Sequence, residues 1–199
     1  CRDWSSDVCS SDLGGYLVAG TTDSTNGDVA GLRGSSDFWV LKLTAEGDIQ
    51  WPKTYGGSNF DSVYNVLQTK DNGYLIFGYS ESNNGDLSNL GYSGNWLVKI
   101  NSNGILQWQK KYLSGRNPYY MKDGITETND GDFIFSSYSS ENTPTSYNDF
   151  GYGFTKISNE GVLIWRKNIS KYSSATVSDL SITKDGGFIV TGYTSFSSN

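Results

Sequence analysis

The chain has 199 residues, of which 15 are Lys or Arg, 21 are Asp or Glu and none is His, for a formal net charge of −6. Because no basic residues cluster, the chain lacks the positive surface that binds phosphate backbones, and no nucleic-acid partner is expected. The absence of histidine excludes a Ser-His-Asp triad and a histidine-ligated zinc site from this segment, and no apolar run approaches the roughly 18 residues that membrane insertion of a helix requires.

Residues 1–13 read as foreign to the rest of the chain. Arg2 to Leu13, RDWSSDVCSSDL, match a translated sequencing-adapter oligonucleotide over twelve consecutive codons; the alternative is a genuine polar N-terminus. Cys1 and Cys9 lie in or against this segment and therefore support no disulfide. We expect residues 1–13 to be an artefact that makes no consistent packing contacts, even if Trp4 covers an exposed edge. We also expect 14–199 to be a fragment of one domain in a larger protein.

From residue 14 onward the chain repeats itself. Trp51, Trp108 and Trp165 follow one another at intervals of 57 residues, and so do three other sets of residues. These sets are Gly47, Gly104 and Gly161; Lys42, Lys99 and Lys156; and Lys53, Lys110 and Lys167. Such a period marks an array of one supersecondary unit. We divide the array into copies 14–70, 71–129, 130–184 and 185–199.

The first three strands of the first copy are short β-branched and aromatic runs without helical spacing. They cover Gly15–Thr21, Phe38–Leu43 and Ile49–Tyr55, and a tight turn before the third strand places Gly47 at positive φ. Pro52 lacks an N–H, which assigns the third strand to the edge of a sheet.

A fourth strand, Ser62–Gln68, is expected to complete the unit, and Asp71-Asn-Gly73 then turns the chain into the next copy. Later copies repeat the pattern. Their strands are expected at Gly73–Tyr79, Trp96–Ile100, Leu106–Tyr112, Asp132–Tyr138, Phe154–Ile157, Leu163–Ile169 and Gly187–Tyr193. The first strand of each copy is apolar on both faces, which is typical of a strand covered on both sides, and Gly20, Gly78 and Gly192 permit close backbone approach.

These elements predict an all-β fold, a partial β-propeller with about three four-stranded antiparallel blades plus the first strand of a fourth. A blade must stack on its neighbours, so we interpret each marker tryptophan as a wedge that buries about 200 Å² between blades. A parallel β-helix has shorter coils, and a β-sandwich does not hold a strict repeat. An open arc would leave two unpaired edges and would aggregate or bind non-specifically through them.

The repeated residues also resemble a known family. Gly15-Tyr-Leu-Val-Ala-Gly, Asn26-Gly-Asp28, Asp37-Phe-Trp-Val-Leu-Lys-Leu and Gly47-x-x-x-Trp-x-Lys-x-Tyr-Gly-Gly57 resemble secreted, propeller-like repeat proteins of the bacterial Bacteroidetes group. The resemblance covers essentially all of 14–199 and implies an extracellular or outer-surface location, but it does not indicate an activity. The third copy departs from it, with Asn142–Ser146 in place of Asn-Gly-Asp. The Gly-x-x-x-Trp hairpin also resembles the repeat of quinoprotein-type propellers.

Two polar loops are the candidate metal sites. Asp23–Asp28 and Glu81–Asp86 offer carboxylate and amide oxygens around a glycine, and Ca²⁺ takes six to eight such ligands. Both loops lack the ligand spacing of an EF-hand, and copy three loses the equivalent of Asp28. Asx turns explain the same residues without a metal, so we favour that interpretation and assign neither a metal site nor a cofactor.

Five carboxylates are candidates for acid–base chemistry if the chain is part of an enzyme. They are Asp37, Asp61, Asp123, Asp130 and Asp179. Most of them lie at expected turns, and their spacing does not single out a pair, so we favour structural roles. The aromatic residues are candidates for a sugar-binding platform, but the tryptophans lie at repeated positions and are interpreted as core residues.

The leading hypothesis is a non-catalytic extracellular or cell-surface β-propeller repeat module that binds a protein or a glycan. The alternative is a fragment of a propeller enzyme, glycoside-active or quinone-dependent, whose active site lies in other blades. A third possibility is a structural spacer in a large surface adhesin. The sequence assigns no catalytic residue to any of them.

Overall fold

The computed structural model is all-β, as the sequence predicts. In the part of the chain that the structure describes, the regular elements are strands apart from one short 3-10 turn, η1 (Gly85–Leu87). The structure describes residues 7–10, 14–27, 29, 31–91, 93–113, 124–140, 150–171 and 174–195. In these residues no helix is long and apolar enough to cross a bilayer. The chain forms two compact units, Cys1–Tyr112 and Leu113–Asn199.

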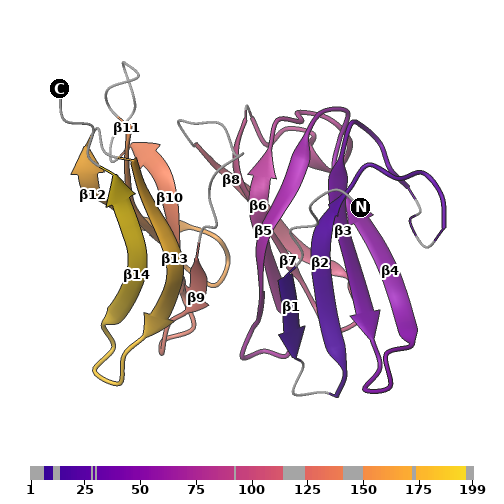
Figure 1. Ribbon diagram of the computed structural model, residues 1–199, viewed down its shortest axis with the longest axis horizontal. Helices are drawn as coiled ribbons and strands as arrows, with labels where there is room; N and C mark the ends of the chain where they lie inside the picture. Colours follow the sequence, from indigo (N-terminus) through magenta and orange to yellow (C-terminus); the bar gives the residue numbers. More distant parts are fainter. Residues whose placement is uncertain are drawn as a thin grey trace. The chain divides into compact units, whose positions relative to one another are not determined.

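Four antiparallel sheets make up the fold (Figure 1). The first contains β1 (Asp7–Ser10), β2 (Tyr16–Thr22), β3 (Asp37–Leu43) and β4 (Ile49–Tyr55) in that order. The second contains β5 (Asp61–Gln68), β6 (Tyr74–Ser80), β7 (Gly94–Ile100) and β8 (Leu106–Leu113). The third contains β9 (Ile125–Glu127), β10 (Phe133–Ser140), β11 (Phe150–Ile157) and β12 (Leu163–Lys171), and the fourth β13 (Ser174–Ile182) and β14 (Phe188–Ser195).

The fourth strand of each predicted copy belongs to the sheet that follows. β5 was expected to complete the first unit, but it pairs with β6 from Asp61↔Ser80 to Gln68↔Tyr74. β9 pairs with β10, and β13 with β14, in the same way. A tight turn forces the two strands that it joins to pair, whereas Gly56–Phe60 carries the chain from one sheet to the next. For this reason the last sheet has two strands instead of the single strand expected.

The expectation that residues 1–13 make no consistent contacts is wrong for part of that segment. Asp7–Ser10 forms β1 and pairs antiparallel with β2, from Asp7↔Ala19 to Ser10↔Tyr16. This is the place that β5 takes beside β6 in the second sheet. An unpaired strand edge offers backbone N–H and C=O groups to any extended segment, whatever its sequence. Trp4 lies outside the described residues.

Turn and edge predictions are confirmed. Gly47, Gly104 and Gly161 have φ of 94°, 72° and 76°. β4, which contains Pro52, is the last strand of its sheet. The expected close approach is seen at Gly78, where a Cβ would lie 2.1 Å from the Ser62 carbonyl oxygen and 2.6 Å from the Phe38 ring. A larger residue at this position would therefore push the first two sheets apart.

The core of the first unit lies between its two sheets. Phe38 of β3 contacts Trp96 of β7 with ring centroids 4.4 Å apart, and both side chains are fully buried. β6 and β7 are buried at every residue, as expected for a strand that is covered on both faces. Leu17 and Ala19 of β2 complete this contact from the first sheet. Burial of the repeated apolar strands therefore stabilises the stack of sheets, because neither sheet covers its own faces.

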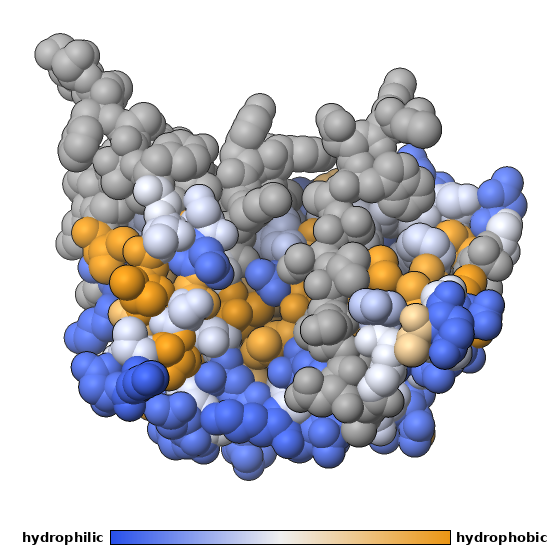
Figure 2. All heavy atoms as spheres, turned by 60° about the horizontal axis from the view of Figure 1, so that its bottom comes forward, coloured by the Kyte–Doolittle hydropathy of each residue, from blue (hydrophilic) through white to orange (hydrophobic). Residues whose placement is uncertain are grey.

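The second unit has its own core, formed by β10, β11 and β13. Tyr152, Val177 and Leu180 are buried together, and the Val177 N–H donates to the Tyr152 hydroxyl at 3.2 Å. Phe188 of β14 packs edge-on against Phe154, with ring centroids 5.1 Å apart. Apolar side chains also reach the surface of this unit (Figure 2, orange on the left). The exposed ones are Val162, Leu163, Ile164, Ile169 and Ile189.

The marker tryptophans are half-buried. Trp51 packs against the core of the first unit, and its ring lies 3.2 Å from where a Cβ on Gly104 of the second sheet would stand. Trp165 packs against the core of the second unit. For Trp51 the interpretation as a wedge between sheets is thus confirmed. Among the described tryptophans, Trp96 is fully buried, although it is not one of the three markers.

Candidate functional site

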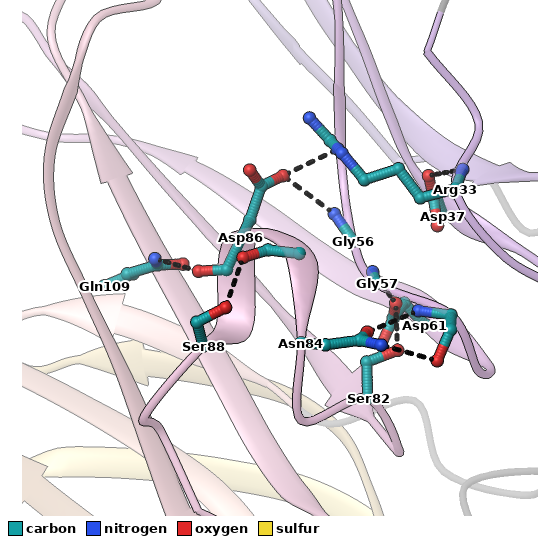
Figure 3. Close-up of polar contacts among 12 residues, drawn as sticks. Arg33, Asp37, Gly56, Gly57, Asp61, Ser82, Asn84, Asp86, Ser88 and Gln109 are labelled. Atoms are coloured by element: carbon teal, nitrogen blue, oxygen red, sulfur yellow. Dashed lines mark hydrogen bonds and ion pairs between the residues drawn. The ribbon is translucent and has the colours of Figure 1, made fainter.

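A group of charged residues surrounds the crossing from the first sheet to the second. Gly56 and Gly57 lie between β4 and β5, Asp37 begins β3, and Asp61 begins β5. Asp86 belongs to η1, in the loop after β6. Figure 3 shows that the side chains of these three aspartates approach the two glycines from different elements. The crossing therefore brings together carboxylates that are far apart in sequence.

The buried pair Asp37 and Asp61 forms the inner part of this group. Both residues are 0% exposed. A Cβ on Gly56 would lie 2.2 Å from Asp37 Oδ1 and 2.9 Å from Asp61 Oδ2. Only glycine leaves room for both carboxyl groups against the same backbone atom. We call Asp37 and Asp61 the carboxyl pair.

Asp61 accepts more hydrogen bonds than Asp37 does. Its Oδ2 accepts hydrogen bonds from the Gly57 N–H at 2.8 Å and the Ser82 hydroxyl at 2.9 Å. Its own N–H donates to the Ser36 carbonyl at 3.0 Å, which joins the start of β5 to the residue before β3. Burial nevertheless outweighs these donors and raises the pKa of Asp61.

Asp37 has fewer donors. Its Oδ2 accepts the Arg33 N–H at 2.9 Å, whereas its Oδ1 is buried and has no hydrogen-bond partner among the described residues. Burial raises the pKa of Asp37 to about 6, and the negative charges of Asp61 and Asp86 act in the same direction. A raised pKa of this kind is typical of neighbouring carboxyl groups that cannot both ionise at low cost.

An outer layer of charges reaches solvent above the carboxyl pair. Asp86 Oδ2 accepts the Arg33 guanidinium at 2.7 Å and the Gly56 N–H at 3.1 Å. The side chains of Arg33 and Asp86 are 40% and 30% exposed. On the other side, Lys111 Nζ donates to the Ser82 carbonyl at 2.6 Å, and burial lowers the pKa of this lysine. The Arg33 guanidinium thus pairs with Asp86, and the Lys111 ammonium interacts electrostatically with Asp61.

The two candidate calcium loops are held by protein groups where the structure describes them. In Glu81–Asp86, Asn84 Oδ1 accepts the Ser58 N–H at 2.8 Å, and Asp86 binds Arg33 and Gly56. In Asp23–Asp28, the Ser24 hydroxyl donates to Asn26 Oδ1 at 2.9 Å. Asp28 lies outside the described residues. The described residues contain no group of three or more Asp, Glu, His or Cys arranged to hold a metal ion.

The other candidate carboxylates do not join the carboxyl pair. Asp130 is exposed and binds Lys156 Nζ at 3.0 Å. Hydrogen bonds from Thr128 and then Lys156 lower the pKa of Asp130 to about 2. Asp179 is exposed, and its Oδ1 accepts the Leu180 N–H at 2.8 Å. Asp123 lies outside the described residues. Of the five candidates, the structure therefore brings together two, which sequence spacing did not single out.

Differences between copies were the signal that could have found this site. Asp37 stands where the next two copies have Gly94 and Gly151. Lys111 likewise stands where the first copy has Thr54. Residues shared by all copies build the sheets, so charged residues present at only one crossing have another role.

Comparisons with known proteins add no family. Neither a scan against protein-family models nor a comparison with curated proteins finds a match to the chain.

Proposed function

We propose that the chain is part of a β-propeller-type array and acts as a non-catalytic binding module on the outside of a bacterial cell. Three sheets share one strand order, and the fourth begins in the same way. The crossing at Gly56–Phe60 leads from the last strand of the first sheet to the first strand of the second, as in a propeller. The resemblance to secreted Bacteroidetes repeat proteins supports the proposed location.

The observation that carries the binding role is the asymmetry between the two ends of the first unit. One end has the short hairpin turns, which repeat from copy to copy (Figure 1, bottom). The other end has the long loops after β2 and β6 and the Gly56–Phe60 crossing, where the copies differ. In repeat proteins, differences of this kind gather on the face that binds a partner.

The chemistry of the loop end suits a polar partner. Ser58, Asn83 and Asn84 are exposed there beside the Arg33–Asp86 ion pair. Hydroxyl, amide, guanidinium and carboxylate groups can bond the hydroxyls of a glycan or the backbone of a protein. The carboxyl pair below them fixes the loops through Gly57, Ser82 and the backbone N–H of Arg33.

Burial of the carboxyl pair supports the non-catalytic assignment over the enzyme alternative. General acid–base catalysis needs a carboxyl group within hydrogen-bond reach of the substrate. Asp37 and Asp61 are 0% exposed, so no substrate reaches them without opening the crossing.

The test uses the labelled full chain on arrays of glycans and of extracellular peptides, followed by calorimetric titration of the strongest binder. Asn83→Ala and Ser58→Ala should each weaken binding about fivefold or more, a loss typical of a removed polar contact. Asn103→Ala and Glu46→Ala at the hairpin end are matched controls and should leave the affinity unchanged. Equal losses at both ends, or no binder on either array, would contradict the proposal. Release of reducing sugar from a bound glycan would favour the enzyme alternative.

A further inference from the structure

β14 is the one strand of its type that has a neighbour on only one side among the described residues. β2, β6 and β10 occupy the same place in the first three sheets, and each pairs on both edges. β14 pairs with β13 alone. Its second edge therefore offers unpaired backbone N–H and C=O groups.

An apolar residue of β14 is more exposed than the equivalent residues of the complete sheets. Ile189 of β14 is 60% exposed, whereas its counterparts Leu75 and Ile134 are 0% and 4% exposed. In the complete sheets the residue at this position is paired with the strand that follows, as Leu75 is with Lys99. Ile134 is also packed against Val177 and Leu180 of the next sheet. A strand set beside β14 would therefore shield Ile189 in part, through the side chain that lies across from it.

The ion pairs of the complete sheets indicate which charged residue a partner strand would carry. In the second sheet the turn residue Asp71 binds Lys99 Nζ of the neighbouring strand at 2.8 Å, and in the third Asp130 binds Lys156 at 3.0 Å. Asp185 occupies the same turn position, and its Oδ1 accepts the Gly187 N–H at 3.2 Å. Asp185 forms no ion pair within the described part of the chain. The edge thus lacks both a strand and the lysine that this strand carries.

We propose that the open edge of β14, together with Asp185, binds an antiparallel strand with the chemistry of β7, an apolar segment with one lysine placed opposite Ile189. The register follows from the pairs Leu75↔Lys99 and Ile134↔Lys156 in the complete sheets. A second copy of this chain cannot supply the strand without breaking a sheet, because its own β3, β7 and β11 are paired on both sides. The occupant that fits this chemistry is a strand of a further repeat copy.

The last strands of the first three sheets carry protection that β14 lacks. β4, β8 and β12 are the last strands of their sheets, and each exposes a lysine at the repeated position. These residues are Lys53, Lys110 and Lys167. Lysine on an edge strand opposes pairing with other strands. β14, with the sequence FIVTGYTS, contains no charged residue.

The test is a titration of the full chain with a labelled peptide of sequence SGNWLVKIN, residues 93–101, followed by fluorescence anisotropy. The peptide should bind, and its Lys→Gln version should bind about three- to tenfold more weakly, since a partly shielded ion pair is lost. Asp185→Asn keeps the acceptor of the turn. This variant should bind the original peptide more weakly to the same degree, and it should bind the two peptides with equal affinity.

Edge specificity is tested by a matched pair of variants. Ile189→Lys on β14 should abolish peptide binding, and Ile49→Lys on the equally apolar but lysine-bearing edge of β4 should leave it unchanged. Peptide binding that survives Ile189→Lys would overturn the proposal. So would a homodimer that excludes the peptide and is broken by Ile189→Lys, because the edge would then accept a second copy. Neither outcome bears on ligand binding by the loop end, which is measured separately.

Discussion

Asp37 carries a carboxyl group that folding removes from water. Asp37 is 0% exposed, and among the described residues its carboxyl group accepts one hydrogen bond, from the Arg33 N–H, while the carboxylates of Asp61 and Asp86 lie nearby. Transfer of a charged carboxylate from water to such a site costs free energy unless it is fully hydrogen-bonded. A protonated Asp37 avoids that cost, which is why its pKa is raised to about 6.

The raised pKa predicts a stability that falls as pH rises. The pKa of Asp37 is raised from an ordinary value of 3.8 to about 6 in the folded protein. Between these two pH values the folded state therefore holds a proton on Asp37 that the unfolded state has lost. Its stabilising effect is complete below pH 3.8 and is lost as pH rises through 6. We expect the free energy of unfolding in urea, followed by tryptophan fluorescence, to decrease by about 2–3 kcal/mol over this window.

Asp37→Asn should flatten this decrease, because the amide does not ionise. Asp61→Asn should reduce it as well, since burial also raises the pKa of Asp61. The control is Asp185→Asn in the second unit. Hydrogen bonds from Thr183 and Gly187 lower the pKa of Asp185, so this substitution should not alter how stability changes with pH above pH 4. A wild-type stability that rises from pH 4 to pH 6.5 would contradict the assignment.

At the scale of elements, a lysine joins the turn that opens each of the first three sheets to the middle of that sheet. Lys99 is 3% exposed, and its ammonium donates to both oxygens of Asp71 and to Gln107 Oε1 at 2.9 Å. Partial burial acts to raise the pKa of Asp71, but hydrogen bonds from Lys99 and Thr69 outweigh it and lower the pKa. In the first sheet Lys42 binds the carbonyl oxygens of Gly14 and Leu43 instead.

The same substitution in two turns should separate the contribution of the ion pair to stability from the contribution of the turn. Asp71→Asn keeps the acceptor for the Gly73 N–H but leaves the buried Lys99 ammonium without its carboxylate. We expect a loss of about 1–3 kcal/mol in the free energy of unfolding. Asp185→Asn changes an equivalent turn that has no lysine partner among the described residues, and it should leave the free energy of unfolding nearly unchanged. Equal losses in chemical denaturation would show that the lysine contributes nothing.

At the scale of the whole molecule, we expect the exposed strand edges to determine how readily the chain aggregates. β4, β8 and β12 end their sheets and expose apolar residues at one repeated position, Ile49, Leu106 and Leu163. Each also exposes the lysine of its copy, which discourages pairing between molecules. We expect these lysines, rather than the net charge, to limit aggregation.

Replacing Lys53, Lys110 and Lys167 together with Val tests this expectation. The triple variant changes the formal net charge from −6 to −9, which by itself favours solubility. We nevertheless expect faster aggregation at neutral pH, measured by light scattering, because three edges lose their protection. The triple Lys→Arg variant keeps the charge and should behave like the wild type. A Val variant that remains monomeric would show that the edges need no such protection.

Local pattern carried the prediction of the strands but not of their partners. Residues 49–55 and 106–112 were recognised by β-branched and aromatic residues next to glycine turns, and the structure confirms them to within one residue. Ser62–Gln68 was recognised as a strand but assigned to the wrong sheet, because alternation within a strand does not say which neighbour it pairs with. The carboxyl pair was missed because Asp37 and Asp61 meet only after the chain crosses between sheets.

The sequence by itself determined that this protein is a repeated array of antiparallel strands, with turns at Gly47, Gly104 and Gly161 and an edge strand at Pro52. Those features follow from the conformations that individual residues allow, so they are written in the local sequence. The tertiary structure alone decided that the fourth strand opens the next sheet, that Asp37 and Asp61 share one buried crossing, and that β14 presents an unshielded edge. These depend on which surfaces exclude water from one another, and that is settled only when distant segments pack together.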